Sequence, residues 1–237
     1  MDNIIQRPSE NCNERLPGTK PKFLIMHYTA CDLDLSLKLL TEDDPDNPVS
    51  AHYLIDTNGD TYSLVPEHMR AWHAGRLSNW GPYNSLNSWS IGIELVNPGH
   101  GDNYHPFPDQ QIDRLAQLSQ EIMGRHQISP WNVLAHADIA PSRKSDPGEL
   151  FPWQALANKG IGVYPPTDLQ PISGDLEGLL REFGYQFGHS FKEMAFAIRA
   201  FCMHYLAHLS APSEMEMVAA LQWLIANHPA MEEIDAA

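Results

Sequence analysis

The sequence predicts an α/β protein with a central mixed β-sheet flanked by helices, followed by a small three-helix domain. Three observations lead to this prediction. Short apolar runs that suit buried strands alternate with helical patterns over residues 22–162. A Pro-containing stretch at 163–174 then interrupts the pattern. Three segments with helical spacing and capping residues follow within 175–237.

Composition limits the partners that this chain can have. Its 237 residues include 30 acidic and 15 basic side chains, which give a formal net charge of −15 at pH 7. Such a chain is repelled by phosphates, so we expect no nucleic-acid partner. No apolar run approaches the ~18–20 residues that span a bilayer, so we expect no transmembrane segment. The oligomeric state is left open by these features.

Cysteine content and the first residues leave two compartments open. Cys12, Cys31 and Cys202 are widely spaced, which excludes a disulfide framework and a thiolate metal site. The first ten residues lack the apolar core of a secretory signal. We therefore expect either a cell-envelope or periplasmic protein whose export segment has been removed, or a cytoplasmic protein.

The elements of the first 162 residues follow in order. Residues 1–21 are polar and contain prolines, and we interpret them as an N-terminal arm. Short apolar runs predict strands. Two segments have helical spacing, and the longer one lies between Pro108 and Gly124, residues that are typical of helix ends. The Asn58-Gly59 pair predicts a tight hairpin turn. The predicted strands are 22–27, 51–56, 61–65, 90–96 and 133–136, and the predicted helices are 34–40 and 109–126.

Beyond the linker at 163–174, helices are expected over 175–183, 191–209 and 214–227. The second and third begin with Ser-x-x-Glu, which matches the capping box. A bundle this small has a thin core, so we expect it to lean on the neighbouring domain. His204 and His208 lie one helical turn apart and could share a metal, but no third ligand lies nearby in the sequence.

Two histidines stand where apolar strands end. His27 and His136 close the strands at 22–27 and 133–136, and strand ends deliver side chains into a crevice. Asp146, in a polar loop with two prolines, could join them. Two imidazoles and a carboxylate form a three-ligand zinc set that leaves a fourth position for water. The alternative for each histidine is a satisfied core residue.

Two further charged residues are candidates for the chemistry. Glu94 interrupts the apolar strand 90–96, where a carboxylate needs a partner. It is either half of a structural salt bridge or a general base that takes a proton from water. Lys144, two residues before Asp146, is either a surface charge or a group that stabilises an oxyanion.

Six segments together carry a family resemblance, namely 23–29, 50–55, 70–75, 90–94, 136–148 and 151–153. Over about residues 20–160 they resemble the zinc-dependent N-acetylmuramoyl-L-alanine amidases of type 2, which share their fold with peptidoglycan-recognition proteins. The resemblance implies hydrolysis of the amide between N-acetylmuramic acid, or its 1,6-anhydro form, and L-alanine of peptidoglycan stem peptides. Cell-wall turnover or recycling would be the setting, with peptidoglycan or muropeptide as the partner.

The resemblance also implies roles for individual residues. The family positions match His27, His136 and Asp146 as ligands of one Zn²⁺ per chain, Glu94 as the residue that activates water, and Lys144 as the oxyanion stabiliser. Substrate-binding positions match His52, Arg70, Trp72 and His73.

One position departs from the family, because Ser85 stands where relatives place an arginine that grips a diaminopimelate carboxylate. The loss of a bidentate guanidinium should weaken that contact. The C-terminal helices are similar to peptidoglycan-binding helical domains, and whether they bind glycan or only buttress the amidase stays open. Two alternative functions also stay open, a non-catalytic peptidoglycan-recognition module and a secreted lysin or toxin that uses the same chemistry.

Overall fold

A mixed six-stranded sheet forms the centre of the protein, as predicted. The computed structural model describes residues 4–42, 44, 46 and 48–229. The strand order is β1-β5-β4-β9-β3-β10, with β4 and β10 parallel to their neighbours β9 and β3, and β5 antiparallel to β4. The strands are β1 Ile5–Gln6, β3 Phe23–Tyr28, β4 Tyr53–Ile55, β5 Thr61–Ser63, β9 Ser90–Leu95 and β10 Val133–Ala135.

The register of the three strands β9, β3 and β10 sets up the functional residues. His27 on β3 pairs with Glu94 on β9, so both side chains leave the same face of the sheet. Ala135, the last residue of β10, pairs with Met26. His136 therefore follows at the level of His27, where it opens helix α3, His136–Ile139.

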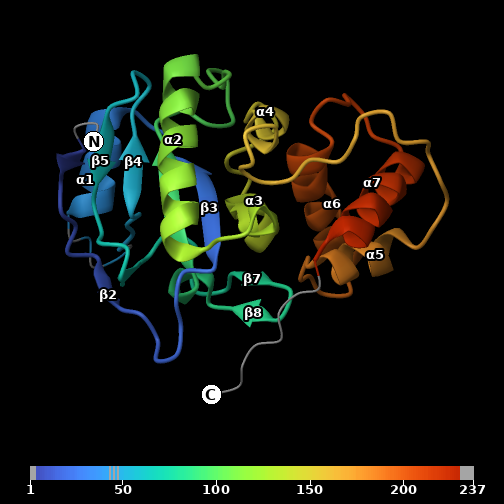
Figure 1. Ribbon diagram of the computed structural model, residues 1–237, viewed down its shortest axis with the longest axis horizontal. Coiled ribbons are helices and arrows are strands. Elements are labelled where there is room, and N and C mark those ends of the chain that lie inside the picture. The colour runs from blue at the N-terminus through green and yellow to red at the C-terminus, as the bar shows by residue number, and fades with distance from the viewer. Residues whose placement is uncertain (1–3, 43, 45, 47, 230–237) are drawn as a thin grey trace.

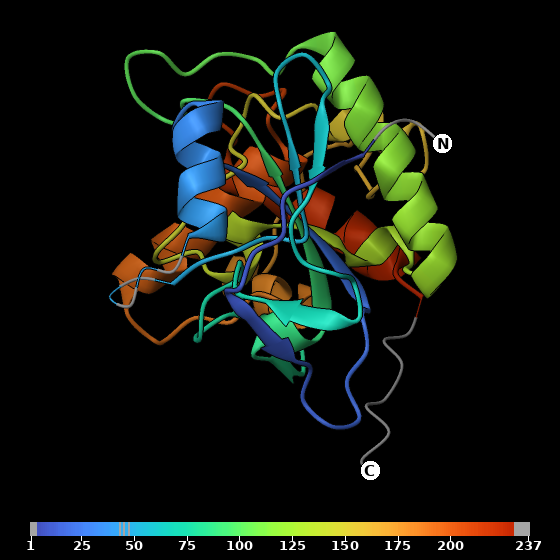
Figure 2. The ribbon, with the colours of Figure 1, turned by 90° about the vertical axis from the view of Figure 1, so that its left-hand side faces the viewer.

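Helices α1, Leu33–Thr41, and α2, Asp109–His126, lie on opposite sides of the sheet (Figure 2). α1 begins at Asp32, whose carboxylate accepts a hydrogen bond from the Leu35 N–H at 2.9 Å. Its buried Leu40 belongs to a small cluster with Leu54 and Val96. The apolar stripe of α2 joins the main core on the other face, as its spacing predicted, through Ile112, Leu115, Leu118 and Ile122.

The N-terminal segment is more than an arm. β1 pairs with β5, and β2, Cys12–Glu14, pairs with β6, Met69–Ala71, in a separate two-stranded sheet. Arg15 holds this segment in place, because its half-buried guanidinium donates to the carbonyl oxygens of Glu67 at 2.9 and 3.2 Å and of Ser90 at 2.9 Å. Strands of two or three residues carry no readable period, which is why the sequence did not predict them.

The Trp- and Gly-rich segment also contains short elements that the sequence did not predict. β7, Asn79–Trp80, and β8, Tyr83–Asn84, form a hairpin, and a 3-10 turn at Leu86–Ser88 leads into β9. By contrast, the predicted Asn58-Gly59 hairpin between β4 and β5 is confirmed, with Gly59 at φ 87°.

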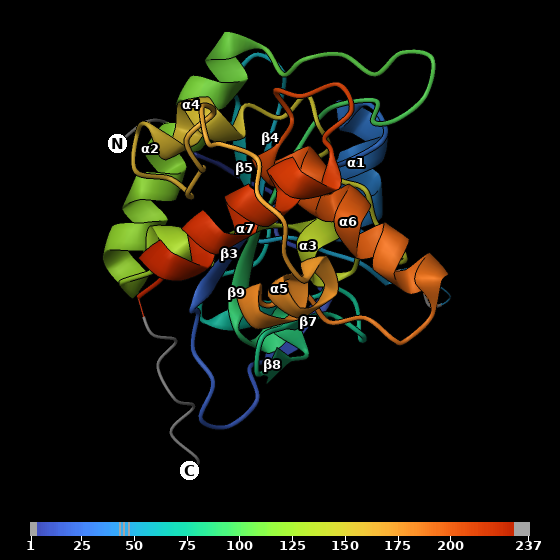
Figure 3. The same ribbon diagram turned by 90° about the vertical axis from the view of Figure 1, so that its right-hand side faces the viewer.

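The C-terminal helices pack beside the β10 edge of the sheet (Figures 1 and 3). They are α5 Leu176–Phe183, α6 Phe191–Tyr205 and α7 Glu214–Asn227, with the short α4 Trp153–Ala157 before them. Ser213 and Glu216 form the predicted capping box. α6 ends at Tyr205 and not at Leu209, because Leu206 adopts a non-helical conformation and is buried.

The sheet and the C-terminal helices share one hydrophobic core. Trp80 makes edge contacts with Phe183 and Tyr185, at centroid distances of 5.6 and 5.0 Å. The boundaries at 22–162, 163–174 and 175–237 stay a prediction, and residues 1–3 and 230–237 of the predicted arm and helical domain lie outside the described residues. No helix in the described part of the chain is both long and apolar enough to cross a bilayer.

Candidate active site

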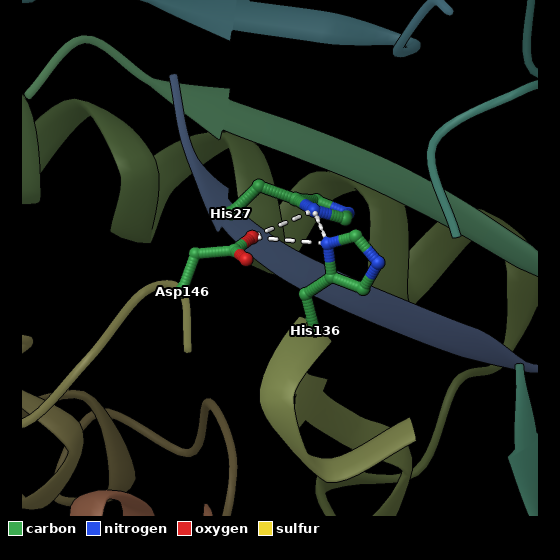
Figure 4. A group of neighbouring side chains, drawn as sticks. All are labelled: His27, His136 and Asp146. Carbon is green, nitrogen blue, oxygen red and sulfur yellow. Dashed lines mark hydrogen bonds and ion pairs between the residues drawn. The ribbon is translucent and has the colours of Figure 1, made fainter. Parts of the chain in front are cut away.

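Three side chains converge at the carboxyl ends of β3 and β10 (Figure 4). Nδ1 of His27 lies 2.9 Å from Nδ1 of His136, and Oδ2 of Asp146 lies 3.1 and 3.0 Å from these two atoms. The three residues are at most 6% exposed. A backbone hydrogen bond from the Ala137 N–H to the Asp146 carbonyl at 3.0 Å brings the loop back to the start of α3.

The protonation states of this group suit a metal ion. Burial, followed by the charge of His136, lowers the pKa of His27 to about 4, so its ring is neutral. Although burial opposes ionisation, the two histidines hold the pKa of Asp146 well below its usual range. Two ring nitrogens whose lone pairs face each other at 2.9 Å repel unless a proton or a metal ion lies between them. Neutral imidazole and carboxylate are the ligand forms that Zn²⁺ takes, so these residues fit zinc.

A chain of hydrogen bonds orients the His27 ring. The Ser90 hydroxyl donates to the Leu86 carbonyl at 2.5 Å, so its oxygen accepts the N–H at Nε2 of His73, at 3.1 Å. Nδ1 of His73 is then an acceptor, and it takes the N–H at Nε2 of His27 at 2.9 Å. This order of donors leaves a lone pair on Nδ1 of His27, the atom that faces His136 and Asp146.

Gly92 makes this arrangement sterically possible. A Cβ atom at position 92 would lie 2.5 Å from Cγ and Nδ1 of His73. The His73 ring therefore lies directly against the backbone of β9, between Ser90 and Glu94 on the same face of that strand. Glycine is therefore required at position 92 of the Ser-Ile-Gly-Ile-Glu segment, because a side chain there would overlap the His73 ring.

Glu94 lies beside the convergent group, with its carboxylate near the His27 ring. Its Oε1 is 3.9 Å from Nδ1 of His27, and its buried Oε2 has no hydrogen-bond partner among the described residues. Burial, and next the negative charge of Asp146, raises the pKa of Glu94 to about 8. No ion pair joins it to a lysine or arginine within the part of the chain that the structure describes, which argues against the structural salt bridge. A desolvated carboxylate with a free oxygen can accept and return a proton.

Two adjoining cavities open at the site formed by His27, His136 and Asp146. One, of about 410 Å³, extends toward α1 and is lined by Ser36, Leu39 and Leu40. The other, of about 750 Å³, is lined by three arginines, Arg70, Arg76 and Arg143. The two cavities have six lining residues in common, Val49, Trp72, His73, His136, Arg143 and Lys144. A ligand that spans the two cavities would therefore pass over the convergent group.

The family model described as N-acetylmuramoyl-L-alanine amidase matches residues 17–149, more than half of the chain. The chain belongs to this amidase family. It is 41% identical over 229 residues to the N-acetylmuramoyl-L-alanine amidase AmiD of Escherichia coli K12, covering 84% of this chain and 80% of that protein.

Solved structures support the same membership. The fold matches E. coli AmiD in complex with the substrate anhydro-N-acetylmuramic acid-L-Ala-D-γ-Glu-L-Lys, with a TM-score of 0.78 at 38% identity over 90% of this chain and 92% of that one. AmpDh3 of Pseudomonas aeruginosa, in complex with anhydromuramic pentapeptide, matches with a TM-score of 0.78 at 32% identity, over 97% of this chain and 100% of that one.

The structure places the two histidines that were predicted to bind substrate, His52 and His73, in different surroundings. His52 does not line either cavity, because it is fully buried (0% exposed), accepts from the Gly92 N–H at Nδ1 and has Arg15 against Nε2. Its contact with the backbone of β9 fits a packing role. His73 does line both cavities, but its ring nitrogens are engaged by His27 and Ser90. His204 and His208 do not belong to a group of metal ligands in the described part of the chain, and their Nδ1 atoms pair with Asp138 and Tyr164.

The wall of the larger amidase cavity includes residues that the sequence analysis missed. The Asn13 side chain on β2 accepts hydrogen bonds from Nε of Arg70 at 2.8 Å and from Nε1 of Trp72 at 3.1 Å, and so holds both predicted groove residues. Arg76 and Arg143 were not singled out. Arg143 could have been identified from the sequence, since it precedes Lys144 in the longest motif. Asn13 could not, because its role depends on pairing between strands that are far apart in the sequence.

Proposed function

We propose that this amidase uses one zinc ion to hydrolyse the amide between N-acetylmuramic acid, or its 1,6-anhydro form, and L-alanine of peptidoglycan stem peptides. The observation that carries the proposal is the convergence of His27, His136 and Asp146 within 3.1 Å, with the carboxylate of Glu94 beside them. The relatives solved with anhydromuramic peptides support the substrate class.

In this mechanism the three side chains hold the ion, and Glu94 handles the proton. Zinc, when bound, supplies Lewis acidity to the scissile carbonyl and to the attacking water. Glu94 takes one proton from that water as its oxygen attacks the carbonyl carbon. Glu94 then gives the proton to the amine nitrogen of L-alanine as the C–N bond breaks, so the carboxylate is regenerated. Lys144, on the rim of both cavities, faces the oxygen that becomes negative.

Charge indicates how the substrate lies. The protein carries a net charge of −15, yet Arg70, Arg76, Arg143 and Lys144 all line the larger cavity. Guanidinium groups bind carboxylates in a bidentate geometry. We assign the stem peptide, with its carboxylates, to this cavity and the sugar to the cavity beside α1. Ser85 lines the peptide cavity as well, so the three arginines are the groups available to replace the guanidinium that relatives carry there.

The test is a product assay on defined substrates. We expect purified protein to release free stem peptide from soluble anhydromuropeptides, detected by mass spectrometry. A chelator should abolish the release, and added zinc should restore it. Binding of muropeptide without any release of stem peptide would contradict the proposal and favour a recognition module. The same assay on intact sacculi shows whether polymeric wall is also a substrate.

A pair of variants tests the assignment of the base. Glu94→Gln should lower kcat by at least ~10²-fold, since the proton acceptor is lost, while zinc content stays at one per chain. Glu121→Gln, on the exposed face of α2, is the matched control and should keep the parent rate. Parent-level turnover by the Glu94→Gln protein would refute the base assignment, and full zinc content in Asp146→Ala would refute the ligand assignment.

A further inference from the structure

Asp138 connects the segment that carries His136 to the C-terminal helices. It lies in α3, two residues after His136, and is fully buried (0% exposed). The Tyr185 hydroxyl donates to its Oδ1 at 2.6 Å, and Nδ1 of His204 donates to its Oδ2 at 2.7 Å. Tyr185 follows α5 and His204 lies in α6. Both side-chain donors therefore come from the C-terminal region.

The same carboxylate also fixes the local backbone. Oδ2 of Asp138 accepts the Ala135 N–H at 2.8 Å, at the point where β10 becomes α3. One residue before Asp138, the Ala137 N–H binds the carbonyl of Asp146 at 3.0 Å. The position of α3 thus determines where His136 and Asp146 lie relative to each other.

Arg199 gives α6 a second contact with this segment. Its NH2 group donates to the carbonyl oxygens of Pro141 and Lys144, both at 3.3 Å. The turn that it holds lies between α3 and Asp146 and includes Lys144 on the cavity rim. Helix α6 therefore contacts both the beginning and the later part of residues 136–146.

Packing keeps the His204 donor in place. The His204 ring is 1% exposed and stacks on Trp153 of α4, with a centroid distance of 3.6 Å and an interplanar angle of 24°. A buried, stacked ring has one accessible orientation, so its hydrogen bond restrains Asp138 firmly.

We propose that Tyr185, Arg199 and His204 are positioning residues for the metal site, through which the C-terminal helices fix residues 136–146. The inference rests on the proposed zinc amidase function and extends it. It gives the C-terminal domain a part in catalysis on substrates too small to reach that domain. A domain that only captures glycan would act on polymeric wall alone.

The test uses variants that remove one contact each from the full-length protein. Tyr185→Phe and Arg199→Gln should each weaken zinc affinity by about 3–10-fold, below the 10–100-fold typical of groups that contact a ligand directly. On soluble anhydromuropeptide, kcat should fall by a similar factor with KM nearly unchanged. The matched controls are Tyr164→Phe, whose hydroxyl pairs with His208, and Arg181→Gln on α5; in the described part of the chain neither side chain has a hydrogen bond to residues 136–146. Both should stay within about 2-fold of the parent.

His204 offers a test by conservative replacement. His204→Phe keeps a ring on Trp153 but removes the donor to Asp138, whereas His204→Asn returns an N–H near the position of Nδ1. We expect His204→Phe to lose zinc affinity and His204→Asn to recover part of it. Equal zinc affinity and kcat in both variants and the parent would overturn the proposal.

Sacculus binding separates the two roles of the C-terminal domain. Measured by co-sedimentation in a Glu94→Gln background, it should be unaffected by Tyr185→Phe and Arg199→Gln. Lost sacculus binding with parent-level zinc affinity and kcat on the small substrate would overturn positioning in favour of glycan capture. Failure of the proposed function itself is visible earlier, because the parent protein would then bind no zinc or show no chelator-sensitive release.

Discussion

Replacement of His73 by phenylalanine is the sharpest single test of how the metal site is held. The change keeps an aromatic ring against Gly92 but removes the acceptor that takes the His27 N–H at 2.9 Å. A buried N–H left without an acceptor costs about 1–3 kcal/mol. At ~1.4 kcal/mol per factor of ten, this predicts a loss of zinc affinity of roughly 10–100-fold.

The assay is competition for zinc against a chelator of known affinity, at a temperature where circular dichroism shows each variant folded. His73→Asn is the matched variant, since its amide oxygen can accept near the position of Nδ1 and should retain much of the affinity. In the zinc-loaded parent, ¹⁵N spectra of the histidines should show His27 protonated at Nε2. Parent affinity in His73→Phe, or a His27 protonated at Nδ1, would refute the reasoning.

Three other perturbations follow from the structure. Gly92→Ala places a methyl group 2.5 Å from the His73 ring and should lower zinc affinity in the same assay, which unchanged affinity would contradict. Despite burial, the hydrogen bonds that Glu67 accepts, that of Arg125 first, lower its pKa to about 2. The resulting stabilisation, about 1–2 kcal/mol after solvent screening, is present above pH ~4.5 and lost as pH falls toward 2. The difference in Tm between the parent and Glu67→Gln should therefore shrink on acidification, and a constant difference would refute this. Arg15→Leu leaves several buried carbonyl groups without a donor and should cost about 3 kcal/mol or more in urea unfolding, whereas a loss below ~1 kcal/mol would show that the arm is held elsewhere.

The sequence predicted those site residues that lie in an apolar strand, or at its end, and also in a segment that carries the family resemblance. His27 and His136 end apolar runs, and parallel strands that end at one edge bring such residues together. Glu94 stood out because a carboxylate in an apolar strand requires a reason. Strand periodicity and residue chemistry singled these residues out, and the family resemblance supplied the roles expected of them.

The contacts that position these residues could not be predicted in the same way. The roles of Asn13, Arg15 and Asp138 depend on partners far away in the sequence, at separations from 52 to 75 residues for the carbonyl groups around Arg15. His52 and His73 look alike in sequence, but only the structure shows that His52 accepts a hydrogen bond from the backbone of β9 whereas His73 contacts His27. Short-range patterns carry no information on such pairings.

The pairing of His27 with Glu94 across β3 and β9 has a consequence for how this enzyme can change. Neighbouring strands lie about 4.8 Å apart wherever a ladder forms. The gap between Glu94, the proposed proton acceptor, and His27, a proposed metal ligand, is thus set by the backbone and not by any surrounding turn. Loops that contact the sugar or the peptide can change in sequence or length to accept other cell-wall fragments. The spacing between Glu94 and His27, on which the proposed cleavage depends, remains the same.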